Sequence, residues 1–139
     1  MDNLKQKMNK LRYCLIIDDD LDDQEIFLMC MNSISKDLDC RTANNGVEAI
    51  AMLESQIEYV PDYIFLDVNM PKMGGMECLT QIKKIDRLRS TKVFMYSTTS
   101  ESSMIEESRA LGADDIIIKP AQTIVLKEIL SKILRIPSK

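Results

Sequence analysis

The segment RYCLIIDDD, residues 12–20, joins a run of strand-forming residues directly to three consecutive aspartates. The same change from apolar to charged residues ends YIFLD, residues 63–67, and IIIKP, residues 116–120. If these runs are parallel neighbours in one sheet, their carboxyl ends lie along one rim. An acidic pair, a single aspartate and a single lysine then meet there, in an arrangement suited to a divalent metal and a phosphoryl group.

Around these runs, strand-like segments alternate with helix-like segments five times. The predicted strands cover residues 12–17, 39–43, 63–66, 92–96 and 115–118. The last two helices are predicted at residues 104–111 and 122–134, and Gly112 is placed to end the former in a left-handed conformation. The predicted apolar helix faces are Ile26, Met29, Cys30 and Ile34; Val47, Ile50, Leu53 and Ile57; Met76, Leu79, Ile82 and Ile85; and Val125, Leu126, Ile129, Leu130 and Ile133. This alternation predicts an α/β fold with a single doubly wound five-stranded parallel sheet, strand order 2-1-3-4-5, helices on both faces, and a flavodoxin-like (βα)5 arrangement.

Length and composition favour one cytoplasmic domain. The chain has 139 residues, for which we expect a polar N-terminal leader at 1–11, one domain at 12–136 and a C-terminal tail at 137–139. A net charge of −4 provides no basic field for nucleic acid, and no apolar stretch is long enough to enter a membrane. The four cysteines form no CxxC pair and histidine is absent, so a zinc site is not expected and the thiols are expected to be reduced.

The string DVNMPKMGGM, residues 67–76, resembles the phosphoacceptor segment of the receiver domains of two-component response regulators. The acidic pair after the first strand and the Lys119-Pro120 pair after the fifth match the same family. Ser97 and Lys119 also follow Asp67 at the family's spacing, by 30 and 52 positions. The likeness extends over residues 12–134. It implies a stand-alone receiver that is not an enzyme and that takes a phosphoryl group from a histidine kinase or a histidine phosphotransfer protein.

The acidic residues of this pattern are predicted to bind Mg²⁺. Mg²⁺ prefers six oxygen ligands and keeps several waters, so one or two carboxylates and a phosphate suffice. Asp19 and Asp67 would bind the ion directly and Asp18 through water, and the resemblance adds the backbone carbonyl of Asn69. Asp67 is the predicted nucleophile, since an ionised carboxylate needs no general base.

The remaining site residues are predicted to manage charge and conformation. Lys119 and the Ser97 hydroxyl would offset the negative charge that phosphorylation adds. Asp20 is expected to act as a helix cap or an outer charge. The family often carries an aromatic residue at the position of Ile116 as part of its switch, so the switch is expected to differ here. Tyr96 is a possible substitute for that ring.

The expected function is signalling by phosphorylation-dependent binding of a downstream protein that the sequence does not identify, or passage of the phosphoryl group along a phosphorelay. The helix at 104–111, the strand after it and the last helix form the expected contact face, although the last helix could equally be ordinary core packing. The protein is expected to be a monomer or a weak dimer. Two alternatives are a Mg²⁺-dependent aspartyl-phosphate phosphatase of the haloacid dehalogenase type, and a receiver that acts only as a protein-binding module.

Overall fold

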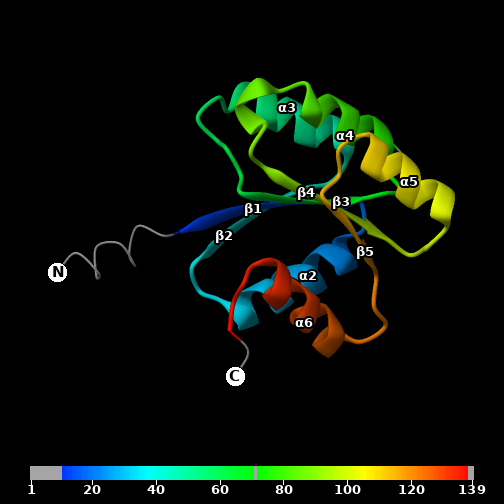
Figure 1. The fold of residues 1–139 in the computed structure, drawn as a ribbon. Coiled ribbons are helices and arrows are strands. Elements are labelled where there is room, and N and C mark those ends of the chain that lie inside the picture. Colours follow the sequence, from blue (N-terminus) through cyan, green and yellow to red (C-terminus); the bar gives the residue numbers. More distant parts are fainter. Residues whose placement is uncertain (1–10, 71, 138–139) are drawn as a thin grey trace.

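One parallel sheet organises the structure. The computed structural model describes residues 11–70 and 72–137. The strands of this part of the chain are β1 Arg12–Ile17, β2 Leu38–Ala43, β3 Tyr63–Asp67, β4 Lys92–Ser97 and β5 Asp115–Ile118. They pair in parallel in the order β2-β1-β3-β4-β5, as Figure 1 shows. The predicted fold class and strand order are confirmed.

Helices cover both faces of this sheet. The helices are α2 Leu21–Ile34, α3 Gly46–Ser55, α4 Gly75–Lys83, α5 Ser102–Ala110 and α6 Thr123–Ile133, with a short 3-10 turn η1 Asp86–Leu88. In Figure 1, α2 and α6 lie below the sheet, while α3, α4 and α5 lie above it. Each connection between parallel strands is a right-handed crossover, so the direction in which the chain moves along the sheet decides which face its helix covers. The chain moves from β1 to β2 in one direction and from β3 to β5 in the other, and its helices therefore cover both faces.

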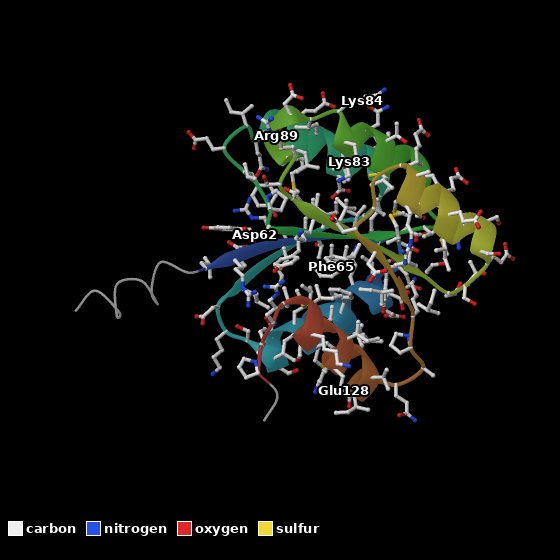
Figure 2. The ribbon with its side chains drawn as sticks, viewed as in Figure 1. Asp62, Phe65, Lys83, Lys84, Arg89 and Glu128 are labelled. Carbon is white, nitrogen blue, oxygen red and sulfur yellow. The ribbon has the colours of Figure 1, made fainter. Side chains whose placement is uncertain are left out.

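Side chains that alternate along each strand divide the core into two layers. Leu15, Ile64 and Met95 pack against α3 and α4, while Phe65 and Phe94 pack against α2 and α6. Figure 2 shows Phe65 below the sheet on the side of α2 and α6, with Glu128 on the outer side of α6. Both faces of the strands are therefore apolar, as expected for a covered parallel sheet.

The predicted apolar face of the first helix is half confirmed, since Cys30 is buried and Ile34 packs against the core. Ile26 and Met29 are 41% and 55% exposed, whereas Phe27 and Met31 are buried together with Cys30. Phe27 packs on Phe65 with ring centroids 4.9 Å apart, and this aromatic contact determines which face of α2 points inward.

Two further helix faces needed correction. Helix α3 ends at Ser55, so Ile57 lies beyond it and is 72% exposed. Val47, predicted to be buried, is exposed, and the small residue Ala49 takes a core position in its place. Val125 of α6 is also exposed, whereas Leu126 and Leu130 of the same predicted face are buried.

The left-handed end predicted at Gly112 is confirmed, since its φ is 104°. The predicted leader at 1–11 lies almost wholly outside the described residues, as does most of the predicted tail at 137–139. Pro71, within the motif at residues 67–76, is also outside them. Within the two described ranges, no helix has the length and apolar character that crossing a bilayer requires.

Candidate metal and phosphoryl site

The carboxyl ends of β1 and β3 bring the predicted acidic residues together. Ile17 pairs with Leu66 across the two strands, so the residues that follow them, Asp18 and Asp67, lie at the same level of the rim. One carboxylate oxygen from each of Asp18, Asp19 and Asp67 lies within 4.8 Å of the others. The structure thus assembles a cluster of three carboxylates from residues nearly 50 positions apart.

Two of these carboxylates are buried. Asp18 is 2% exposed and Asp67 is 5% exposed, while Asp19 faces solvent. Burial, followed by the nearby Asp18 carboxylate, raises the pKa of Asp67 to about 7. Burial also raises the pKa of Asp18, although the backbone N–H of Asp20 donates to its Oδ1 at 3.0 Å. The unliganded cluster therefore holds its negative charge at a cost in free energy.

Lys119 follows β5 and extends its ammonium into this cluster. Its Nζ lies 3.5 Å from Oδ1 of Asp67 and 3.9 Å from Oδ2 of Asp18. Burial opposes its charge, but the nearby carboxylates, Asp67 first and then Asp23, outweigh burial and raise the pKa of Lys119. The ammonium also lies 4.9 Å from the ring centroid of Tyr96, within cation–π range.

Ser97, at the end of β4, and Asn69, in the loop after β3, lie at the same end of the sheet as the cluster. Ser97 ends β4, is fully buried, and accepts a hydrogen bond at its Oγ from the Thr99 N–H at 3.1 Å. Its carbonyl accepts from the Lys119 N–H at 2.7 Å, which ties the end of β4 to the residue that follows β5. The Asn69 N–H donates to Oδ1 of Asp67 at 3.3 Å. Asn69 therefore contacts the cluster, and Ser97 directly follows Tyr96, the residue that pairs with Asp67.

Tyr96 and Ile116 lie on opposite faces of the sheet. Ile116 pairs with Met95 and packs with the layer under α3 and α4. Tyr96 pairs with Ile117 and packs with the layer against α2 and α6, 5.4 Å from the ring of Phe27. Tyr96 therefore cannot substitute for an aromatic ring at Ile116, because neighbouring strand residues point in opposite directions.

Helix α4 holds the loop after β3 by close backbone contact. The Gly75 N–H donates to the Val68 carbonyl at 2.9 Å. A Cβ at Gly75 would lie 2.6 Å from the Asp67 carbonyl oxygen and 2.7 Å from the Val68 Cα. Only a residue without a side chain fits here, so the glycine fixes the backbone that carries Asp67.

The acidic run after β1 contributes two further residues. The Asp20 side chain accepts from the N–H groups of Asp22 and Asp23 at 2.9 and 3.2 Å, so it caps α2 as one of its two predicted roles requires. Asp23 was not predicted as a site residue, yet its Oδ2 accepts a hydrogen bond from Lys119 Nζ at 3.1 Å. The sequence signal was an acidic first helical turn, which the helix dipole alone explains.

The chemistry of these donors fits a hard divalent cation. The ligand atoms are carboxylate oxygens, which Mg²⁺ and Mn²⁺ prefer over nitrogen or sulfur. Burial raises the pKa of both Asp18 and Asp67, and the neighbouring Asp18 carboxylate adds to the rise at Asp67; a cation between the carboxylates would favour their ionised forms. Asp18, Asp19 and Asp67 are the residues that would hold the ion.

Comparison with known proteins points to one family. The model of a family described as the response regulator receiver domain matches residues 14–131. Chemotaxis protein CheY of Listeria monocytogenes is 36% identical over 115 residues, which are 81% of this chain and 92% of that protein. A protein-glutamate methylesterase/protein-glutamine glutaminase of Methanospirillum hungatei is 33% identical over 115 residues, covering 83% of this chain. This chain spans only 33% of that second relative.

A solved structure agrees with these sequence matches. The phosphorylated cyanobacterial phytochrome response regulator RcpA superposes with a TM-score of 0.81 at 26% identity. The match covers 91% of this chain and 99% of that one. The two chains therefore share the same fold.

Proposed function

We propose, given that this chain belongs to the response regulator receiver domains, that Asp67 accepts a phosphoryl group from a phosphohistidine donor. The observation that carries the proposal is the convergence of Asp67, two further aspartates and Lys119 at one rim. The donor would be a histidine kinase or a histidine phosphotransfer protein. In this role the protein is a signalling switch and not an enzyme in its own right.

In the transfer step, a carboxylate oxygen of Asp67 attacks the phosphorus atom. The new O–P bond forms as the P–N bond to the donor imidazole breaks, and the imidazole nitrogen takes up a proton. Asp67 must be ionised to attack, so its raised pKa opposes the reaction at low pH. The Lys119 ammonium 3.5 Å away favours the ionised form.

The residues that would hold Mg²⁺ are Asp19 and Asp67 directly, Asp18 through water, and the backbone carbonyl of Asn69. When bound, the ion would neutralise charge on the carboxylates and on the phosphoryl oxygens. Ser97 and Lys119 would then donate to the phosphoryl group. The Ser97 Oγ already accepts from Thr99, which leaves its hydroxyl hydrogen free to donate.

Phosphorylation would shift a conformational equilibrium toward a state that binds a downstream protein. Alternatively, the phosphoryl group would pass onward in a relay. The contact face we propose consists of α5, β5 and α6. Helix α5 supports this assignment, because Met104 and Ser108 are its buried residues and its other side chains are largely exposed. We place the protein in the cytoplasm as a monomer or weak dimer, without nucleic-acid or membrane partners.

Ile116 occupies the position where we expect the switch of this family to differ. The side chain is half-buried beside Met95, and isoleucine has no ring that could rotate inward. We propose that phosphorylation is therefore reported by movement of the loops around Ser97 and Lys119.

The direct test is labelling with acetyl phosphate and Mg²⁺, followed by intact mass measurement. We expect the wild type to gain one phosphoryl group and Asp67→Asn to gain none, because the amide cannot form the acyl phosphate. Asp20→Asn is the matched control, since asparagine caps helices as well as aspartate and labelling should persist. Full labelling of Asp67→Asn would exclude Asp67 as the acceptor.

The same samples test the phosphatase alternative. A phosphatase of the haloacid dehalogenase type would use the acids after β1 and release phosphate from a small ester over many turnovers. Sustained release of phosphate from p-nitrophenyl phosphate by the Asp67→Asn protein would favour that alternative. Stoichiometric labelling that stops at one phosphoryl group favours the receiver.

A further inference from the structure

The ammonium of Lys119 lies closer to a helix residue than to the carboxylates of the rim. Nζ is 3.1 Å from Oδ2 of Asp23, against 3.5 Å from Asp67 and 3.9 Å from Asp18. The contact to Asp23 is a hydrogen bond, while the separations to the other two exceed ordinary hydrogen-bond lengths. Asp23 is thus the nearest carboxylate to Lys119 and its hydrogen-bond acceptor in this unphosphorylated state.

Asp23 is held in place by the cap of its own helix. Its backbone N–H donates to the capping side chain of Asp20 at 3.2 Å, which fixes the first turn of α2. Lys119 is confined from another side by the ring of Tyr96, 4.9 Å from Nζ. The lysine side chain is only 16% exposed, so it is enclosed between a carboxylate and an aromatic ring.

Although the Lys119 ammonium has three N–H donors, its resting position gives it hydrogen-bond distance to Asp23 and not to Asp67 or Asp18. A phosphoryl group on Asp67 would replace the single negative charge of the carboxylate with about two, and it would place strong acceptor oxygens close to Lys119. Lysine has a flexible stem with rotatable donors, so it can move from one partner to the other. Every such move weakens the hydrogen bond to Asp23.

We propose that Asp23 is a positioning residue that holds Lys119 in the resting state and competes with the phosphoryl group for its ammonium. This inference rests on the proposed function of Asp67 as phosphoacceptor. The hydrogen bond from Lys119 to Asp23 stabilises the resting state more than the phosphorylated state. Asp23 thereby makes the phosphorylated state less favourable, since a conformational equilibrium responds to the difference between the interactions in its two states. It sets the threshold of the switch without touching the reacting atoms.

The test is binding of beryllofluoride, a phosphoryl mimic, to the full chain with saturating Mg²⁺, measured by titration calorimetry. We expect Asp23→Asn to bind beryllofluoride about two- to fivefold more tightly than wild type, the range of a partly exposed ion pair. Asp22→Asn is the matched control, because Asp22 is exposed in the same helical turn and carries the same charge. Its affinity should stay close to that of wild type.

Repeating the titrations in a Lys119→Gln protein distinguishes an effect of Asp23 on Lys119 from an effect of losing one negative charge. In Lys119→Gln protein, Asp23→Asn should change the affinity no more than Asp22→Asn does, because the competition is gone. Asp23→Glu keeps the charge and should restore most of the wild-type affinity. Asp23→Ala provides a second removal variant, and circular dichroism checks that each protein is folded.

The outcomes of these titrations are distinct. If wild type binds no beryllofluoride and does not label at Asp67, the proposed function fails. If wild type binds and labels but Asp23→Asn matches Asp22→Asn, the function stands and Asp23 has no positioning role. An equal effect of Asp23→Asn with and without Lys119 would also overturn the inference.

Discussion

The unliganded protein should become more stable when its phosphoacceptor is neutralised. Asp67→Asn removes a buried carboxylate that lies beside Asp18. Raising a carboxyl pKa from 3.8 to about 7 corresponds to about 4 kcal/mol of destabilisation above pH 7. Sharing of the proton with Asp18 and relaxation of the surrounding backbone reduce this destabilisation. We therefore expect Asp67→Asn to raise the free energy of unfolding by about 2 kcal/mol at pH 8.

The sign of this effect depends on pH. Well below the unfolded pKa of 3.8 the carboxyl is protonated in both folded and unfolded protein, so the mutation changes little. As pH rises, the unfolded chain ionises first and the wild type loses stability until the folded pKa of about 7 is passed. The advantage of Asp67→Asn should therefore grow between pH 4 and 7 and remain constant above it.

The assay is urea unfolding followed by circular dichroism, with a chelator present, at pH 4.5 and pH 8. Asp37→Asn, in an exposed loop, is the control and should change the free energy of unfolding by less than about 0.5 kcal/mol. A mutant less stable than wild type at pH 8 would refute the reasoning, as would a gain of equal size at both pH values. In saturating Mg²⁺ the wild type should instead be more stable than Asp67→Asn, because only the wild type keeps all the carboxylates that would bind the ion.

Two further predictions concern the ion and the backbone beneath it. At a concentration ten times the Kd for Mg²⁺, in the millimolar range, the ion should stabilise the wild type by about 1.4 kcal/mol. Asp19→Asn should lose most of this gain. An unchanged melting temperature of the wild type on addition of Mg²⁺ would contradict the metal site. Gly75→Ala should destabilise by about 1–3 kcal/mol in thermal unfolding, because its Cβ would lie 2.6 Å from the Asp67 carbonyl oxygen. Gly74→Ala, whose Cβ would meet nothing within 4 Å, should cost less than about 1 kcal/mol, and equal losses at both glycines would show that crowding is not the cause.

The strand order and the members of the rim could be predicted from sequence for a simple reason. Charge directly after a buried apolar run marks the carboxyl end of a strand, and parallel strands bring those ends together. Asp18, Asp67 and Lys119 therefore follow from topology alone. Their raised pKa values do not, because these depend on burial and on distances of a few ångströms.

The inward face of α2 could not be decided in the same way. Apolar residues occur in two overlapping helical frames, one through Ile26 and Met29 and the other through Phe27 and Met31. Both frames satisfy the helical period, so packing against Phe65 and Tyr96 makes the choice. Asp23 was missed for a related reason, since its contact with Lys119 joins residues 96 positions apart that no spacing rule connects.

The setting of Tyr96 gives the protein a built-in optical reporter. The chain contains no tryptophan, so its four tyrosines dominate the near-ultraviolet absorption and emission. Tyr13 and Tyr63 lie at or near the starts of their strands and Tyr59 packs edge-on against Tyr13, at the end of the sheet away from the rim. Tyr96 alone among them lies beneath the Lys119 ammonium, and displacement of that cation would change the electric field at its ring. Occupancy of the rim could thus be followed by fluorescence in unlabelled protein.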